Sequence, residues 1–372
     1  MSIRILAESS PGEVRIGLTR DGRLEEYAIW RPGFPDEVGD LHRGRITARV
    51  PAMAGAFVAI AGAEGFLPDS QGGANATEGE SVAVRVTRAA QGGKGPRLTA
   101  VLDETERPIA EQAGPGPPLL LSRGPGPLLE FAGLHPEAAV IVNEPALAAR
   151  LRPALGGRLR VEAPVFDDTL AGEIEELSEP RVVLPGGAVL HIYPTPALVA
   201  IDVDCGSTAA VRDGKATAQI AVNRGLLPDL ARQIRLRNLS GAILVDLAGL
   251  SPRRRASLAP ALADALAADP LRPRLLGFTS LGLAEIVRRR IRPPLHELLS
   301  GPHAAGLAAL RAVAAEIAAD PARLPALIAA PAVVAALEAD PAALPDLARR
   351  AGRPLILRSD PTLAPHGWRM EG

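Results

Sequence analysis

Two apolar runs that end in carboxylates constrain the fold of this chain more than any other feature. Residues 198–204 include Asp202 and end in Asp204, and residues 242–246 end in Asp246. Each run predicts a buried β-strand, and because strand side chains alternate between faces, Asp202 and Asp204 should share one face. Two carboxylates about 4 Å apart repel by roughly 4 kcal/mol at an effective dielectric constant near 20. A hard divalent cation would remove that cost, so the pattern indicates a magnesium site at the strand ends.

A simpler explanation exists for each acid, because aspartate often follows a buried strand to start a turn. Three acids on two neighbouring strands favour the metal site instead. We expect Asp202 and Asp246 to bind the ion directly and Asp204 to orient water or a neighbouring group. A bound cation lowers the pKa of its water and offsets charge on a phosphate under attack.

The composition limits the class of protein. A chain of 372 residues predicts two to four folding units, and its net charge of -1 excludes a generally basic nucleic-acid binder. The single cysteine, Cys205, excludes an internal disulfide and a multi-cysteine zinc site, and we expect it to be a small buried residue. The six histidines, including His42 and His191, show no ligand spacing and predict structural or surface roles. The start of the chain lacks a signal-peptide core and no apolar run reaches about 18 residues, so we expect a cytoplasmic protein without membrane contact.

The first half of the chain predicts strands and a barrel. Residues 40–102 contain short alternating segments separated by glycines, which is typical of a small closed barrel. Residues 113–127 are rich in Pro and Gly and predict a connection. The remaining elements expected here are strands at 2–7, 13–20, 24–31, 138–142 and 158–162 and helices at 145–154 and 168–177.

The second half alternates strands and helices, which indicates an α/β layer domain. After the hairpin strands 181–184 and 188–193 we expect the two acid-bearing strands, helices at 220–239, 252–268 and 281–290, and a strand at 274–279. The last part could be low-complexity sequence, but its regular helical spacing favours a small folded α/β unit. That unit would contain helices at 303–319, 331–338 and 343–351 and a strand at 354–358.

Three residue types, phenylalanine, lysine and arginine, predict an RNA-binding surface. Phe57 and Phe66 could be barrel core, or exposed rings on which bases stack for roughly 1–3 kcal/mol each. Lys94 lies among glycines in residues 91–96 and could contact a phosphate or simply be a solvated hairpin lysine. Arg232 and Arg235 share a helix face by their i, i+3 spacing. With the arginine runs 253–255 and 288–290 they fit a phosphate-lined channel, although such runs are often only solvated.

Several motifs follow one another in a specific order. They comprise residues 43–47, 55–58, 65–68, 93–99, 200–204, Asn223, 231–239 and 242–246. In this order they resemble the ribonuclease E/G family of bacterial endoribonucleases, and the resemblance covers most of the chain.

The resemblance implies an α+β and α/β multidomain fold. Residues 1–36 and 128–178 would form an RNase H-like unit, with an OB-fold RNA-binding barrel at 37–102 inserted into it. Residues 103–127 would be a connection, residues 179–297 a DNase I-like catalytic domain, and residues 300–372 a small C-terminal domain.

The resemblance also implies a function. The family cleaves single-stranded, often A/U-rich RNA in ribosomal RNA maturation and messenger decay. We therefore expect a magnesium-dependent endoribonuclease, with manganese as a substitute ion, in which Asp202 and Asp246 hold the metal. A non-catalytic RNA-binding relative is the alternative, and a phosphohydrolase acting on small nucleotides is a weaker one.

This chain departs from the family pattern at several positions. Asp204 replaces the usual Asn, and Gly249 replaces a second acid. The Arg-Thr pair with which relatives hold a 5′-monophosphate has no counterpart. Residues 300–306 replace the cysteine-containing zinc link, so we expect no structural zinc. A homo-oligomer could form, but not a zinc-linked dimer.

Overall fold

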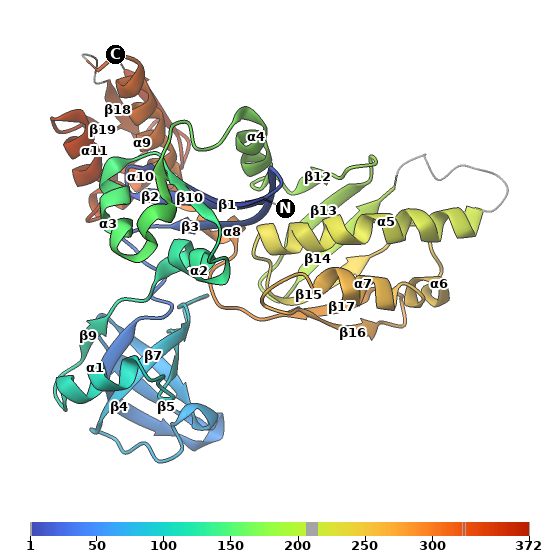
Figure 1. The fold of residues 1–372 in the computed structure, drawn as a ribbon, viewed down its shortest axis with the longest axis horizontal. Coiled ribbons are helices and arrows are strands. Elements are labelled where there is room, and N and C mark those ends of the chain that lie inside the picture. Colours follow the sequence, from blue (N-terminus) through green and yellow to red (C-terminus); the bar gives the residue numbers. More distant parts are fainter. Residues whose placement is uncertain (1, 206–214, 322, 324, 372) are drawn as a thin grey trace. The chain divides into compact units, whose positions relative to one another are not determined.

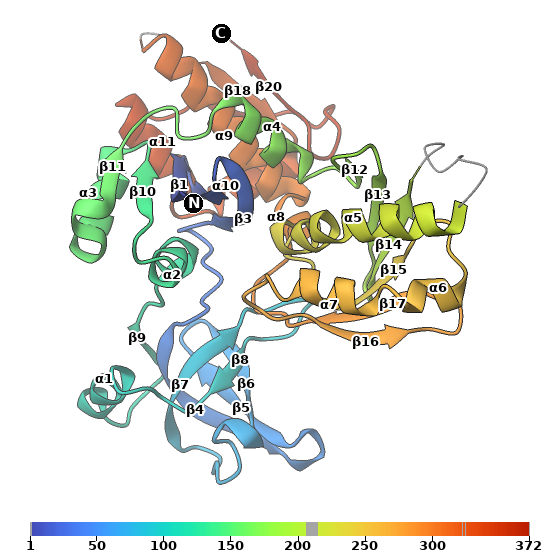
Figure 2. The same ribbon diagram turned by 45° about the vertical axis from the view of Figure 1, so that its right-hand side comes forward.

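The protein folds into mixed α and β structure that divides into two compact units. The computed structural model describes residues 2–205, 215–321, 323 and 325–371. One unit combines residues 1–29, 135–290 and 294–372, and the other combines residues 30–134 and 291–293. Figures 1 and 2 show the elements of each unit from two directions. Among the described residues, no helix is long and apolar enough to cross a membrane.

The first sheet of the larger unit has the strand order β11-β10-β1-β2-β3. The predicted N-terminal strands are present, and β10 and β11 add parallel pairs beside β1. Helix α4 begins after Asp167, whose carboxylate accepts a hydrogen bond from the backbone N–H of Leu170 at 2.9 Å. The elements are β1 (Ile3–Ser10), β2 (Glu13–Arg20), β3 (Arg23–Trp30), β10 (Ala139–Val142), α3 (Pro145–Leu155), η3 (Gly156–Arg158), β11 (Leu159–Val161) and α4 (Asp168–Glu176).

The smaller unit contains the predicted closed barrel. Its strands are β4 (Leu41–Val50), β5 (Gly55–Ile60), β6 (Ala63–Pro68), β7 (Ser81–Arg88) and β8 (Arg97–Thr99), with short helices η1 (Pro51–Met53) and η2 (Asp69–Gln71). Because β4 pairs with both β5 and β7, the sheet closes on itself. Its interior is filled by the buried side chains Ile46, Ala56, Val58, Ile60, Leu67, Val84, Val86 and Leu98. This barrel is consistent with an OB-like domain.

The segment predicted as a connection at 103–127 contains regular structure. It includes α1 (Glu106–Ala113) and β9 (Leu119–Ser122), and α2 (Gly126–Leu134) begins at its end. Strand β9 pairs antiparallel with β4 and extends the barrel sheet. The Pro/Gly loop before β9 is held by Arg43, whose guanidinium donates to the carbonyls of Pro117 at 2.8 Å and Ala113 at 2.9 Å. Composition alone did not reveal these long-range partners.

A six-stranded sheet carries the predicted acids. Its order is β12 (Arg181–Val183), β13 (Val189–Pro194), β14 (Val199–Asp204), β15 (Gly241–Asp246), β17 (Ala284–Arg288) and β16 (Arg274–Phe278). Helices α5 (Lys215–Leu236), α6 (Pro252–Ala256) and α7 (Ala259–Leu266) complete this part, and Figures 1 and 2 show α5 and α7 over one face. Val199, Ile201 and Val203 of β14 point into the core under these helices.

The predicted helix at 281–290 is wrong, because these residues form strand β17. Ala284, Ile286 and Arg288 are buried and alternate with partly exposed Glu285 and Val287, which is the period of two of a strand. A turn closed by the backbone N–H of Gly282 and the carbonyl of Thr279, 2.8 Å apart, reverses the chain after β16. Strand β17 then pairs with both β16 and β15. The predicted helix at 252–268 is divided into α6 and α7.

The C-terminal part contains the expected helices and a small sheet. Its elements are α8 (Leu295–Leu298), α9 (Gly301–Ala319), β18 (Ala326–Ala329), α10 (Pro331–Glu338), α11 (Ala343–Ala351), β19 (Leu357–Ser359) and β20 (Trp368–Glu371). It packs on the β1–β2 turn, where Gly12 has φ +75° and a Cβ atom would lie 2.6 Å from the Cβ of Ala343. Arg311 pairs with buried Glu13 at 2.7 Å across the same contact.

Candidate active site

Asp202 and Asp246 lie side by side on one face of the six-stranded sheet. They are register partners in the parallel pair of β14 and β15, and neighbouring strands are about 4.8 Å apart. Both point away from the helix-covered core, because the alternate residues Ile201 and Val245 are buried in it. We call this surface the open face. Asp204 also lies on it, two residues beyond Asp202.

The open face exposes its acids to different degrees. Asp202 and Asp204 are exposed, whereas the Asp246 side chain is 46% exposed and lies 2.5 Å from an Nη1 atom of Arg255. The Arg255 side chain is itself mostly buried and also donates to the Leu250 carbonyl at 2.9 Å. The guanidinium therefore offsets the charge that Asp202 and Asp246 would otherwise concentrate on neighbouring strands.

The two neighbouring carboxylates fit a magnesium ion. Magnesium usually binds through one or two carboxylates and keeps several waters, and the open face leaves Asp202 in contact with solvent. Within the described ranges, no group of three or more His, Cys, Asp or Glu side chains is arranged to hold a metal ion. A magnesium ion at Asp202 and Asp246 would therefore complete its coordination with water or substrate oxygens.

Helix α5 holds the loop that follows Asp246. The side-chain amide of Asn223, which is fully buried, donates to the Ala248 carbonyl at 3.1 Å, and that of Gln219 donates to the same carbonyl at 3.2 Å. Gly249 has φ +63°, and a Cβ atom there would lie 3.1 Å from Nε2 of Gln219. The sequence marked Asn223 only by resemblance. The structure shows that it positions the chain next to Asp246.

Cys205 is buried next to the acids, as predicted. Burial, with a smaller contribution from Asp204, raises the pKa of its thiol. A nucleophilic cysteine needs the opposite shift, so Cys205 acts as a packing residue.

Arg232 and Arg235 do not form the RNA-binding surface that their spacing suggested. Both are at least nine-tenths buried. Arg232 donates to the Leu24 carbonyl at 2.6 Å and pairs with Glu173 at 2.8 Å. Arg235 donates to the Glu25 backbone carbonyl at 2.9 Å and pairs with the Glu25 carboxylate. These arginines join α5 to β3 and α4, so their donors are already engaged within the protein.

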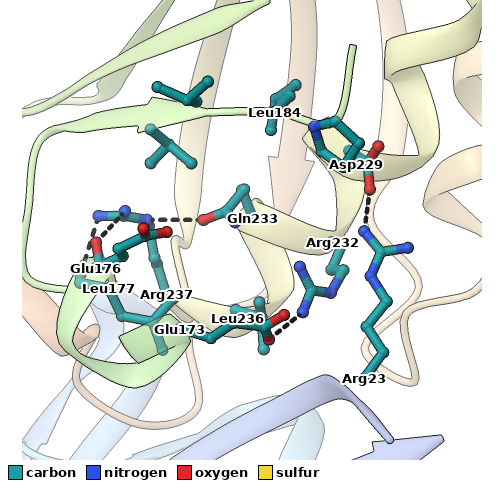
Figure 3. Close-up of a pocket in the computed structure, with 13 residues that line it drawn as sticks. Arg23, Glu173, Glu176, Leu177, Leu184, Asp229, Arg232, Gln233, Leu236 and Arg237 are labelled. Atoms are coloured by element: carbon teal, nitrogen blue, oxygen red, sulfur yellow. Dashed lines mark hydrogen bonds and ion pairs between the residues drawn. The ribbon is translucent and has the colours of Figure 1, made fainter. Parts of the chain in front are cut away.

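The same helix lines a pocket of about 330 Å³ in the larger unit. Figure 3 shows Arg23, Arg232 and Arg237 on its wall, each with a protein partner. Arg237 donates to the carbonyls of Leu177 at 2.9 Å and Glu176 at 2.9 Å, which satisfies the end of α4. Burial lowers the pKa of Arg237 to about 10, although nearby carboxylates oppose that shift. These contacts on the wall of the pocket join α4 to α5, so the arginines there have a structural role.

The two arginine runs, residues 253–255 and 288–290, contain both exposed and buried side chains. Arg253 and Arg254 are exposed, whereas Arg288 is 4% exposed and pairs with buried Asp269 at 2.6 Å. Arg288 also donates to the side-chain oxygen of Asn238 at 2.7 Å. Arg288 is therefore a core residue and not part of a phosphate channel.

The barrel presents Phe57 and Phe66 on its outer surface. They are register partners on β5 and β6, are partly exposed, and pack edge to face with ring centroids 5.6 Å apart. The neighbouring Ala56, Val58 and Leu67 fill the interior, so the core explanation for the two rings does not hold. Arg97, which no sequence pattern had indicated, lies 5.9 Å from the centroid of the Phe66 ring.

Lys94 is exposed at the end of a tight hairpin. Residues Gln91 and Lys94 pair through two backbone hydrogen bonds of 3.0 Å, and Gly92 and Gly93 take positive φ between them. Gly95 packs on the barrel so closely that a Cβ atom would lie 1.9 Å from the Glu64 carbonyl oxygen. Only glycine permits this approach, which fixes the base of the hairpin that carries Lys94.

The fold and the open face describe a multidomain protein with a closed barrel and a sheet that carries two adjacent carboxylates. Comparison with known proteins narrows this class. The sequence model of the Ribonuclease E/G family matches residues 147–291, which contain both acids. Ribonuclease G of Haemophilus influenzae is 24% identical over 80% of this chain and 82% of its own length. The chain is therefore similar to proteins of the ribonuclease E/G family.

Ribonuclease E relatives match over a smaller share of their own length. Ribonuclease E of Nostoc sp. is 38% identical over 126 residues, which cover 34% of this chain and 18% of that protein. Ribonuclease E of Escherichia coli is 25% identical over 77% of this chain and 36% of its own length. The chain thus spans well under half of these longer relatives.

Proposed function

We propose that this protein is an endoribonuclease that cleaves single-stranded RNA with magnesium as its cofactor. The observation that carries the proposal is the register pairing of Asp202 and Asp246 on an open sheet face. The names of the ribonuclease G and E relatives supply the substrate class. Ribosomal RNA maturation or messenger decay in the cytoplasm is the process that we propose for it.

The chain's own residues would divide the work between two surfaces. Asp202 and Asp246 would hold the ion, which when bound lowers the pKa of water and offsets phosphate charge. Asp204 lies on the same face and would orient the attacking water. Arg255 would keep the Asp246 carboxylate in place through the ion pair between them. Attack of water on the phosphodiester would leave 5′-phosphate and 3′-hydroxyl ends.

The barrel would hold the RNA strand. Phe57 and Phe66 present ring surface to bases, and stacking is tolerant of sequence because every base has a flat face. Lys94 adds a point charge at an exposed hairpin. Together they fit a surface that binds unstructured RNA without reading a particular sequence.

Single-turnover cleavage of an unstructured, end-labelled oligoribonucleotide tests the proposal. We expect cleavage with magnesium, slower or comparable cleavage with manganese, and none after chelation. The products should be degraded by an exonuclease that requires a 5′-phosphate. A DNA oligonucleotide of the same sequence serves as the control substrate.

The same assay separates the alternatives. Unchanged RNA affinity without cleavage in any divalent ion would identify a non-catalytic RNA-binding protein. Hydrolysis of small nucleotides that long single-stranded RNA does not inhibit would identify a phosphohydrolase. Either result would contradict the endoribonuclease proposal.

A further inference from the structure

The acid pair belongs to a row of side chains that crosses four strands of the sheet. Arg181 of β12 is the register partner of His191 in β13, His191 is the partner of Asp202, and Asp202 is the partner of Asp246. Register partners on neighbouring strands place their side chains on the same face. His191 therefore flanks Asp202 on the side opposite to Asp246, and exposed Arg181 ends the row at the sheet edge.

A second aromatic side chain lies next to His191. Tyr193 is two residues further along β13, so it projects from the same face. The rings of His191 and Tyr193 are nearly parallel, with 6° between their planes and 6.3 Å between their centroids. The Tyr193 side chain is 54% exposed. Its partner on β14 is Ala200, a residue too small to cover the ring.

These rings differ from an isolated exposed aromatic residue, which needs no explanation on a protein surface. Two parallel rings from one strand lie on the same open face as the acid pair, and His191 is in direct register with Asp202. Each strand step is about 4.8 Å, so a nucleotide whose phosphate lies at Asp202 and Asp246 brings its base within reach of the rings. Arg181 supplies positive charge on the same side.

We propose that His191 and Tyr193 form a base-stacking subsite that holds one nucleobase of single-stranded RNA next to the phosphate to be cleaved. This inference rests on the proposed endoribonuclease function. Stacking on an aromatic side chain is tolerant of base identity, so the subsite orients the strand without fixing a sequence. It is separate from the aromatic pair Phe57 and Phe66, which lies on the barrel.

A fluorescence scan tests the subsite directly. A series of short oligoribonucleotides carries the fluorescent base 2-aminopurine at each position in turn. Stacking on an aromatic ring quenches the fluorescence of this base. The scan uses the full-length protein with calcium in place of magnesium. At one position of the oligonucleotide, we expect Tyr193→Ala to abolish the fluorescence quenching and Tyr193→Phe to retain it. Phe57→Ala serves as the matched control and should affect quenching at a different position. Tyr193→Leu keeps apolar bulk without a ring and should behave like Tyr193→Ala.

Steady-state cleavage gives the second measurement. Tyr193→Ala should raise KM about tenfold, while Tyr193→Phe stays within about twofold of the native enzyme. His191→Phe preserves a ring and should retain most of the affinity that His191→Ala loses. The change is expected mainly in KM, because stacking contributes to binding of the strand.

The outcomes separate failure of the subsite from failure of the function. If the native enzyme cleaves RNA and the alanine variants change neither quenching nor KM, the subsite is overturned while the nuclease proposal stands. If the native protein does not cleave RNA, the nuclease proposal fails, and the fluorescence scan still decides whether the rings bind a base. If His191→Ala lowers kcat and alters the pH dependence of cleavage but leaves quenching unchanged, His191 transfers a proton and does not stack on a base. This result would overturn the subsite.

Discussion

At the scale of single residues, the ion pair between Asp246 and Arg255 stabilises the negative charge of the Asp246 carboxylate when no metal ion is bound. The guanidinium is 13% exposed and lies 2.5 Å from the carboxylate, so the negative charge is partly neutralised. Arg255 contacts one oxygen of the Asp246 carboxylate, so a metal ion would share this carboxylate with the guanidinium. Asp202 instead faces solvent, which leaves its oxygens accessible to a cation.

Asp246→Asn tests the role of this carboxylate. The substitution removes one anionic ligand but keeps the shape of the side chain, so cleavage should fall by roughly 1,000-fold or more. RNA affinity should remain within about twofold, because the barrel is untouched. Single-turnover cleavage and filter binding measure the two quantities. Asp264→Asn, at an exposed position of α7, is the control, and equal cleavage by both variants would remove Asp246 from the site.

Glu26 on β3 should make stability depend on pH. Burial raises its pKa from 4.5 to about 7, and Asp269 and Glu25 raise it further, whereas Arg235 and Arg288 lower it. Between those two pH values the folded state binds more protons than the unfolded state. The free energy of unfolding should therefore fall as pH rises from about 4.5 to 7.

Glu26→Gln should remove this contribution. We expect a flatter pH profile of unfolding free energy and a gain of up to about 3 kcal/mol at pH 8, measured by urea denaturation. Glu162→Gln, at an exposed position, controls for loss of a carboxylate. A pH profile identical to that of the native protein would contradict the assignment.

At the scale of secondary-structure elements, α5 connects the five-stranded and the six-stranded sheets of the larger unit. The first half of α5 supports the loop after Asp246 through Asn223. Its last turns hold β3 through Arg232 and Arg235, and Arg237, directly after the helix, holds the end of α4. A single helix therefore fixes both the candidate site and the neighbouring sheet, and its buried arginines serve the fold.

Arg235→Gln distinguishes a structural arginine from an RNA-binding one. Breaking a buried, hydrogen-bonded pair should lower the free energy of unfolding by about 3 kcal/mol, measured by urea denaturation. RNA affinity of the folded protein should change little. Arg253→Gln, at an exposed position on α6, should stay within about 0.5 kcal/mol of native stability. If Arg235→Gln binds RNA more weakly but is as stable as the native protein, Arg235 contacts RNA, as its sequence position predicted.

Substitutions on the barrel surface should weaken RNA binding independently of the acidic site. Phe57→Ala combined with Lys94→Ala should weaken binding of a single-stranded oligoribonucleotide at least about tenfold, because it removes a stacking surface and a positive charge. Isothermal titration or filter binding measures the change. Val101→Ala, at another exposed apolar position, should leave affinity unchanged. Normal affinity in the double variant would refute the role of the barrel.

At the scale of the whole molecule, a net charge of -1 means that RNA must be held by local patches. The exposed basic side chains available for this include Arg181, Arg253, Arg254, Arg289 and Lys94. They lie on elements from both compact units. RNA binding therefore depends on local positive charge and not on the total charge.

Salt dependence measures how many phosphates are contacted. For single strands, the logarithm of the binding constant falls with the logarithm of salt concentration by about 0.7 per phosphate. Contact with about four phosphates gives a slope near -3, and Lys94→Ala should reduce its magnitude by up to about 0.7. A slope near zero would show that phosphate contacts contribute little.

The sequence determined the local features of this protein. Periodicity of two located the acid-bearing strands, and the apolar residues on one side of β14 required Asp202 and Asp204 to share the other side. Glycine-separated strands predicted the barrel, and ordered motifs indicated a resemblance to the ribonuclease E/G family. These signals are carried by neighbouring residues, so they can be read without a structure.

Only the tertiary structure decided which distant residues meet. Register between β14 and β15 placed Asp202 next to Asp246, and the same ladder placed His191 beside them. Burial turned Arg235 and Arg288 into core partners of Glu25 and Asp269, although their sequence context suggested a surface. Pairing also made β17 a strand. The physical reason is that a charged side chain or a short apolar segment takes its role from the neighbours that packing supplies.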